Sequence, residues 1–217
     1  MSAAGWAWVA LLLYLAGLVL AFGVRTWLQI RWTGTSGFRG ISGQSGSAAW
    51  WGGVLFPIAL LLGLAAPVLM LTGITAPVLP AHPGLAAAGI IVGLAGLVVV
   101  LLAQAAMGSS WRIGVDDTER TELITSGLFR SIRNPIFTGM AAVCAGVALM
   151  APTLVAVLAL ACLIAAVQIQ VRVVEEPYLR RVHGDTYSHY AAGAGRFLPG
   201  LGRARPADAK ARTDAGT

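Results

Sequence analysis

The chain has 217 residues, of which 57% are hydrophobic and 11% are charged, and its mean hydropathy is +0.77. Soluble domains are about 45–50% apolar and about 25% charged, so this composition excludes an ordinary soluble domain. The net charge of +6 rests on too few charged residues for a nucleic-acid-binding surface, and it is typical of basic loops that orient a membrane protein. We therefore expect an integral membrane protein whose surroundings are the lipid bilayer.

Five apolar segments are candidates for membrane-spanning helices, at residues 6–28, 51–71, 85–107, 135–150 and 153–171. A helix needs about 20 residues to cross the hydrocarbon core, so we expect the short fourth segment to be tilted or covered by its neighbours. Only Ala151 and Pro152 separate the fourth and fifth segments. The expected fold class is an all-α integral membrane protein with five transmembrane helices, a helical hairpin of spans 4 and 5, and a cytoplasmic C-terminal helical segment.

The basic residues predict the orientation of these spans. All 15 Lys and Arg residues lie in or beside the first loop, in the third loop or in the C-terminal part. With five spans these regions share one side, which places the N-terminus outside and the C-terminus in the cytoplasm of an inner or plasma membrane. We expect one membrane-embedded domain at 1–200 and a disordered basic tail at 201–217. Tryptophans at the span ends are expected to anchor at the lipid headgroups: Trp6, Trp8, Trp27, Trp32, Trp50, Trp51 and Trp111.

Two glycine patterns have structural interpretations. Gly89, Gly93 and Gly96 lie four and three residues apart on the third span, which favours close approach to a neighbouring helix over a pore or a dimer face. The stretch Gly34-Thr-Ser-Gly-Phe-Arg-Gly40 resembles a phosphate-binding loop, but no strand precedes it, so it is weak as a nucleotide motif. We expect a flexible cytoplasmic loop that closes over a site.

Polar residues gather at the cytoplasmic ends of the later spans, where unpaired charge is costly and usually functional. Gln104 lies near the end of the third span, and Arg130 and Arg133 precede the fourth. Pro135 suits the first turn of a helix, and we expect Asn134 to cap that helix with its side-chain oxygen. A simpler interpretation of the two arginines is that they set the topology and contact lipid phosphates.

A second polar group follows the fifth span, where Arg172 precedes Glu175 and Glu176 by three and four residues. On a regular helix this spacing brings Arg172 to the face of both glutamates. Adjacent carboxylates at a bilayer boundary need cations, and we expect them from Arg172 and from Arg130 or Arg133. Two interpretations stay open: an interfacial salt-bridge network, or a pocket in which glutamates bind an ammonium or ribose hydroxyls and an arginine binds a carboxylate.

Two motifs carry a family resemblance. The first is Gly127-Leu-Phe-Arg-Ser-Ile-Arg-Asn-Pro-Ile-Phe137, and the second comprises Glu175-Glu176, Leu179, His183-Gly184, Tyr187, Tyr190, Arg196 and Pro199. Together they resemble the isoprenylcysteine carboxyl methyltransferase family and the related phospholipid and small-thiol methyltransferases, over about residues 104–199. The resemblance implies a helical membrane enzyme with S-adenosylmethionine in a cytoplasmic-side pocket and a lateral opening for a lipidic acceptor. The chain departs from the pattern at Asn134, where the family has histidine, and at Phe129 and Phe137, where it has tyrosine.

The resemblance also implies a set of site residues. Those expected to bind the cofactor are Gln104, Arg133, Asn134, Pro135, Glu175, Glu176, Tyr187 and Tyr190. Arg172 and Glu176 are the candidate catalytic residues. We expect Arg172 to orient a carboxylate, and Glu176, or alternatively His183, to take a proton from an amine or thiol acceptor. A carboxylate acceptor of the isoprenylcysteine type needs no general base, because it is already ionised near neutral pH. The cysteine and histidine spacings predict no metal site.

Two other functions remain open at this point. Some membrane sterol reductases resemble this C-terminal architecture and use NADPH, although they are much longer chains. A scaffold or transporter subunit would bind no cofactor, but transporters usually carry ionisable residues or broken helices at mid-membrane. The sequence identifies neither the acceptor nor the oligomeric state.

Overall fold

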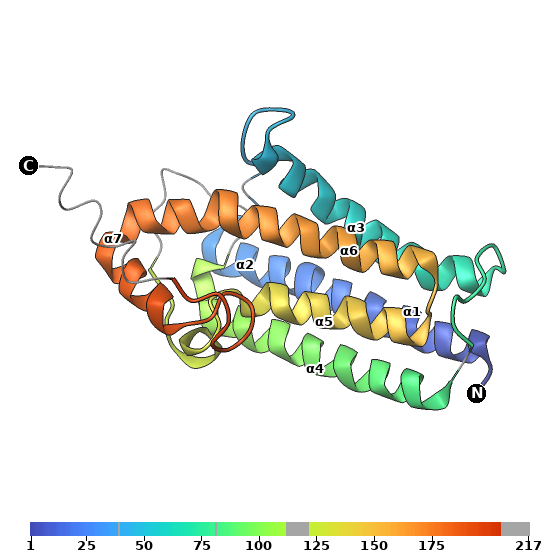
Figure 1. The fold of residues 1–217 in the computed structure, drawn as a ribbon. Coiled ribbons are helices and arrows are strands. Elements are labelled where there is room, and N and C mark those ends of the chain that lie inside the picture. Colours follow the sequence, from blue (N-terminus) through green and yellow to red (C-terminus); the bar gives the residue numbers. More distant parts are fainter. Residues whose placement is uncertain (39, 81, 112–121, 205–217) are drawn as a thin grey trace, which may run out of the picture.

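The computed structural model describes residues 1–38, 40–80, 82–111 and 122–204, and within them the protein is built from helices (Figure 1). One continuous N-terminal helix contains α1 (Ala3–Leu18), the π-turn η1 (Val19–Val24) and α2 (Arg25–Thr33). The bundle is completed by α3 (Ala48–Leu71), α4 (Pro83–Met107), α5 (Pro135–Met150) and α6 (Leu154–Ile169). α6 continues through the π-turn η4 (Gln170–Glu175) into α7 (Glu176–Gly193), and two 3-10 turns are η2 (Gly108–Ser110) and η3 (Gly127–Arg130).

Several of these helices are long and apolar enough to cross a membrane: Ala3–Thr33, Ala48–Leu71, Pro83–Ser110 and Leu154–Gly193. α5 has only 16 residues and packs against α1, α4 and α6, as expected for a short segment covered by its neighbours. The apolar helices indicate a multi-pass membrane protein. The count of five spans, the membrane and the orientation of the termini stay predictions.

The closest helix packing is between α4 and α5, where glycines face each other. A Cβ added to Gly96 would lie 2.6 Å from the carbonyl oxygen of Gly139, and one added to Gly146 would lie 2.5 Å from that of Gly89. Both distances are shorter than side chains tolerate, so these backbones approach closely only because the residues are glycines. The predicted role of the glycine pattern in helix packing is therefore confirmed.

One end of the bundle collects the polar elements. Figure 1 shows α2, α7 and the segments that follow α4 at the end opposite the N-terminus, with the α5–α6 turn at the other end. This is the arrangement that the distribution of basic residues predicts. Of those residues, Arg39, Arg112, Arg120, Arg205, Lys210 and Arg212 lie outside the described residues.

Trp111 differs from the predicted membrane anchors. Its side chain is 3% exposed, whereas Trp8 and Trp27 are exposed as expected. The guanidinium of Arg25 lies 4.8 Å from the Trp111 ring centroid and donates a hydrogen bond to the carbonyl of Gly108. Arg25 itself is 5% exposed. The expected anchoring role of Trp111 is wrong, because the ring packs inside the protein against the buried Arg25 of α2.

Candidate active site

A short backbone pairing joins the two sequence motifs. Ile132 and Gly195 form a parallel β-bridge, in which Arg133 N donates to Gly195 O at 2.8 Å and Gly195 N donates to Ser131 O at 3.0 Å. A Cβ on Gly195 would collide with the carbonyl oxygen of Leu198, so this tight turn requires glycine. The pairing places the segment before α5 directly beside the segment after α7.

Glu176 lies between two arginines at this junction, and we call the group the Arg133–Glu176–Arg196 cluster. Glu176 Oε1 accepts hydrogen bonds from Arg133 Nη2 at 2.8 Å and from Arg196 Nε at 2.7 Å, while Oε2 accepts from Arg196 Nη2 at 2.9 Å. The hydrogen bond to Glu176 raises the pKa of Arg196 above its ordinary value, although burial opposes this rise. The cluster is therefore charged, and it ties the start of α7 to both motif segments.

Arg133 is the most heavily bonded member of the cluster. It is 7% exposed, and its Nη1 donates to the carbonyls of Ala191 and Ala194 at 2.7 and 2.9 Å. Its Nη2 donates to the carbonyl of Gly202 at 3.0 Å as well as to Glu176. The contacts of Arg133 thus reach Gly202 in the expected tail, and residues 205–217 of that tail lie outside the described residues.

Arg172 is not part of this cluster. It is exposed, and its Nε donates to Gln168 Oε1 at 2.8 Å. The π-turn at 170–175 widens the helix at this point, so the four-residue spacing no longer brings Arg172 to Glu176. The cations on Glu176 among the described residues are Arg133 and Arg196. The expected pairing of Arg172 with Glu176 is therefore wrong. The expected role of Arg172 in orienting a carboxylate stays a prediction, and the exposed position of Arg172 does not support it.

Asn134 also differs in part from its prediction. Pro135 is the first residue of α5 as expected, but the Asn134 side chain does not cap that helix. Its Nδ2 instead donates to the carbonyl of Arg196 at 3.0 Å, and its backbone N donates to the same oxygen at 3.1 Å. The cap prediction is wrong because the Asn134 amide is turned toward the carbonyl of Arg196 in the second motif segment, where it makes its hydrogen bond.

A cavity of about 250 Å³ opens beside the cluster, between α3, α5, η4 and the end of α4. Its polar wall is formed by residues from four segments: Ser42, Ser110, Asn134, Gln170, Glu175 and Tyr178. Its apolar wall contains Phe22, Phe56 and Phe137, with ring centroids 6.4 Å apart for the first pair and 6.3 Å for the second. Gly40 lines it too, so the predicted glycine loop does lie at a site.

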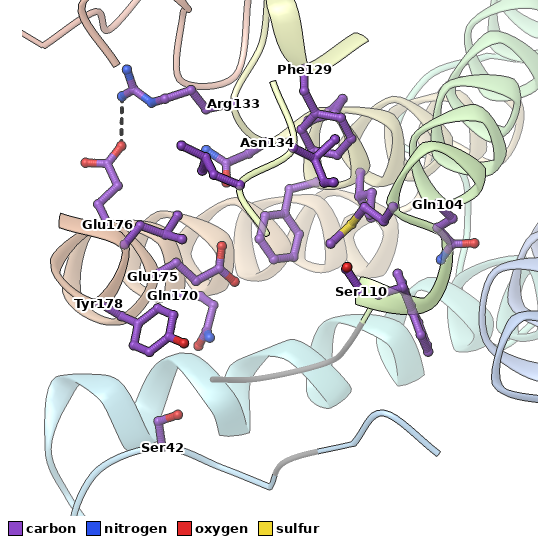
Figure 2. Close-up of a pocket in the computed structure, with 18 of the residues that line it drawn as sticks. Ser42, Gln104, Ser110, Phe129, Arg133, Asn134, Gln170, Glu175, Glu176 and Tyr178 are labelled. Carbon is purple, nitrogen blue, oxygen red and sulfur yellow. Dashed lines mark hydrogen bonds and ion pairs between the residues drawn. The ribbon is translucent and has the colours of Figure 1, made fainter. Parts of the chain in front are cut away.

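The structure brings all eight predicted cofactor residues to the cavity lining: Gln104, Arg133, Asn134, Pro135, Glu175, Glu176, Tyr187 and Tyr190. Their side chains point in different directions. Figure 2 shows Glu175 extending into the cavity, while Glu176 turns away to Arg133. The amide of Gln104 points to the N-terminal helix, where Nε2 donates to Ala21 O at 2.9 Å. The lining residues are thus of two kinds. Some, such as Glu175, extend into the cavity, and others, such as Glu176 and Gln104, bond to neighbouring segments and fix the position of the helices around it.

The two tyrosines reach the cavity because α7 is kinked. Gly184 has φ 52° and ψ −123° inside the helix, a conformation that suits glycine. Tyr187 is 1% exposed and packs edge-to-face with Tyr190, with ring centroids 6.1 Å apart. Tyr190 Oη donates to the carbonyl of Phe129 at 2.7 Å. The pair therefore fixes the end of α7 over η3.

Sequence reasoning missed several residues of this site. The sequence points to Arg196 only as a motif match. Two adjacent glutamates at a membrane boundary need more than one cation, and this need is a signal that could have indicated Arg196. Gln170 and Tyr178 flank the glutamate pair and could have been found from the helical spacing. Ser42 and Phe22 come from the N-terminal part of the chain, which carries no recognisable motif.

The comparisons with known proteins agree with this geometry. Residues 85–186 match the phospholipid methyltransferase family model. The matched region runs from α4 into α7 and includes Arg133, Glu175 and Glu176. The resemblance to membrane methyltransferases drawn from the two motifs is thereby confirmed. A comparison with curated proteins gives no match.

Proposed function

We propose that the protein is an S-adenosylmethionine-dependent membrane methyltransferase whose acceptor carries a hydrocarbon chain. The observation that carries this proposal is the two-sided cavity in the region of the family match. One wall bears a carboxylate and amides, and the other is aromatic and apolar. Such a cavity suits a polar cofactor that meets an acceptor with an apolar body.

The residues present fit this cofactor. S-adenosylmethionine has sulfonium and ammonium cations, ribose hydroxyls and an adenine ring. Glu175 extends into the cavity as a counter-charge for a cation (Figure 2), and the amides of Asn134 and Gln170 are able to hold hydroxyl or ring nitrogen groups. When bound, the cofactor supplies a methyl group activated by its sulfonium.

The chain's own contribution to the reaction is positioning. Methyl transfer is an in-line displacement, so its rate depends on how precisely the two reactants are held. The Arg133–Glu176–Arg196 cluster fixes α7 to both motif segments. Both oxygens of Glu176 are occupied by guanidinium groups, so Glu176 acts as a positioning residue in this proposal and not as a general base.

The charges of the cavity bear on the acceptor. The sequence favoured a carboxylate, which would need a cation inside the cavity. Among the described residues that line it, Arg133 is the one arginine, and its Nη atoms already serve Glu176 and three backbone carbonyls. Glu175 adds a negative charge instead. This balance favours an amine acceptor and leaves the isoprenylcysteine-type carboxylate as the second candidate.

Methyl transfer to matched acceptors tests the proposal. Purified protein in detergent is supplied with methyl-labelled S-adenosylmethionine and either n-hexadecylamine or hexadecanoic acid. We expect label in the amine, a loss of at least about tenfold in turnover for Glu175→Gln, and near-normal turnover for the exposed control Asp185→Asn. Label in the acid alone would restore the carboxylate acceptor. Failure to bind S-adenosylmethionine would contradict the proposed function itself.

A further inference from the structure

A second, smaller chamber lies behind the main cavity, toward the middle of the bundle. Its volume is about 40 Å³, and its lining includes Tyr14, Gly17 and Cys144. Phe22 and Met140 line both spaces. These two side chains therefore border both spaces, and the chamber lies on the bundle side of the cavity's apolar wall.

Phe22 stands at this junction because the first helix is locally widened. It belongs to the π-turn η1, and its ring packs edge-to-face with that of Phe56. A π-turn disturbs the regular hydrogen bonding of a helix, and here the carbonyl of Ala21 accepts a hydrogen bond from Gln104 Nε2 at 2.9 Å. Gln104 is 3% exposed. Gln104 thus stabilises the π-turn η1, which places the Phe22 side chain between the main cavity and the inner chamber.

The chemistry of the chamber suits hydrocarbon and not water. Most of the side chains that line it are aliphatic, and the hydroxyl of Tyr14 already donates to the carbonyl of Leu60 at 2.9 Å. A buried water needs several polar partners, and apolar cavities stay dry. At about 10–15 Å³ for each water-sized group, the chamber has room for roughly three such groups. That is the size of the last few carbons of a chain.

About half of the chamber's lining comes from the part of the chain that the family match does not cover. Tyr14, Gly17, Ala21 and Phe22 belong to the N-terminal helix, whereas the match begins at residue 85. Glu175 and most of the polar wall lie inside the matched region, whereas Ser42 lies outside it. The N-terminal helix, which the match does not cover, therefore contributes one side of the chamber.

We propose that this inner chamber receives the end of the acceptor's hydrocarbon chain, so that Gly17 and Phe22 set the length of chain the enzyme accepts. This inference rests on the proposed function for the identity of the acceptor. The chain would lie along the apolar wall and pass between Phe22 and Met140, while its polar head stays beside Glu175. Chain-length specificity is then a property of the first helix.

A pair of glycine substitutions on the first helix tests the inference. A Cβ at Gly17 would lie 4.0 Å from Leu97 and from Val143, so Gly17→Val fits and narrows the chamber. Gly23→Val is the matched control, because nothing lies within 4 Å of its added Cβ. The substrates are n-alkylamines from decyl to octadecyl, with n-alkanoic acids of the same lengths if the acids are the methylated series.

We expect Gly17→Val to lower kcat/KM for the longest acceptors about tenfold, as the loss of about two buried methylenes implies. The shortest acceptors and the affinity for S-adenosylmethionine should be unchanged, and Gly23→Val should behave as the wild type. An unchanged length profile in Gly17→Val, or the same shift in both variants, would overturn the inference.

A labelling experiment gives a readout that does not need turnover. An n-alkylamine with a terminal diazirine loses N₂ on irradiation, and the carbene inserts into a nearby C–H, O–H or S–H bond. We expect adducts on peptides that contain Tyr14 or Cys144, reduced in Gly17→Val and retained in Gly23→Val. Adducts confined to lipid-facing residues such as the exposed Leu61 would overturn the inference. Chamber adducts in a protein that does not bind S-adenosylmethionine would support the chamber and refute the proposed function.

Discussion

Replacing Glu176 by glutamine should destabilise the protein, because it removes the negative charge between Arg133 and Arg196. The carboxylate accepts three charged hydrogen bonds of 2.7–2.9 Å, and Arg133 is 7% exposed. Removing one partner of a buried ion pair costs about 3–5 kcal/mol. The Arg196 side chain is 21% exposed and so regains some hydration, which places our expectation near the lower end, about 3 kcal/mol.

Thermal unfolding in detergent measures this cost. At roughly 2–4 °C for each kcal/mol in a chain of this size, Tm should fall by roughly 6–12 °C in Glu176→Gln. Asp185→Asn is the control, since it makes the same chemical change at an exposed position of the same helix, and its Tm should stay within about 2 °C. Equal Tm values for the two variants would refute the structural role of the cluster. A Glu176→Gln protein with normal stability but lost turnover would instead restore Glu176 as a catalytic base.

Three further substitutions test other parts of the structure. Gly146→Val places a Cβ 2.5 Å from the carbonyl of Gly89, so Tm should fall by roughly 5 °C or more, while Gly23→Val should leave it unchanged. Tyr190→Phe removes one hydrogen bond to the backbone of η3 and should cost about 1 kcal/mol in an unfolding titration, with S-adenosylmethionine affinity within about threefold of wild type. Arg25→Met removes the contact with the carbonyl end of α4 and should expose the neighbouring tryptophan, seen as a red shift of its fluorescence; an unshifted spectrum would contradict the packing described.

Much of the fold follows from simple properties of the sequence. Runs of apolar residues predict the helices because only a helix satisfies its backbone in lipid. Pro135 starts α5 as predicted, since a proline at the first helical position loses no hydrogen bond. The turn between α5 and α6 falls at Ala151 and Pro152, where the apolar run is broken. Seven of the eight expected cofactor residues belong to two motifs, and they line one cavity because these motifs, far apart in sequence, are joined at Gly195.

The remaining differences arise where local register or long-range packing overrides a regular pattern. The π-turn at 170–175 separates Arg172 from Glu176, and no spacing rule for a regular helix anticipates it. Trp111 leaves the expected membrane boundary because Arg25, distant in sequence, stacks on its ring. Phe22 enters the site through another π-turn. Each of these depends on contacts between segments that have no shared motif.

Calorimetric titration of the purified wild-type protein with S-adenosylmethionine and, separately, with NADPH tests the central claim most directly. We expect saturable binding of S-adenosylmethionine, weakened at least about tenfold by Glu175→Gln, and no heat with NADPH. Binding of NADPH alone would support a reductase, and binding of neither would leave no support for a methyltransferase. Either result would contradict a methyl-donor site in the cavity between α3, α5, η4 and the end of α4.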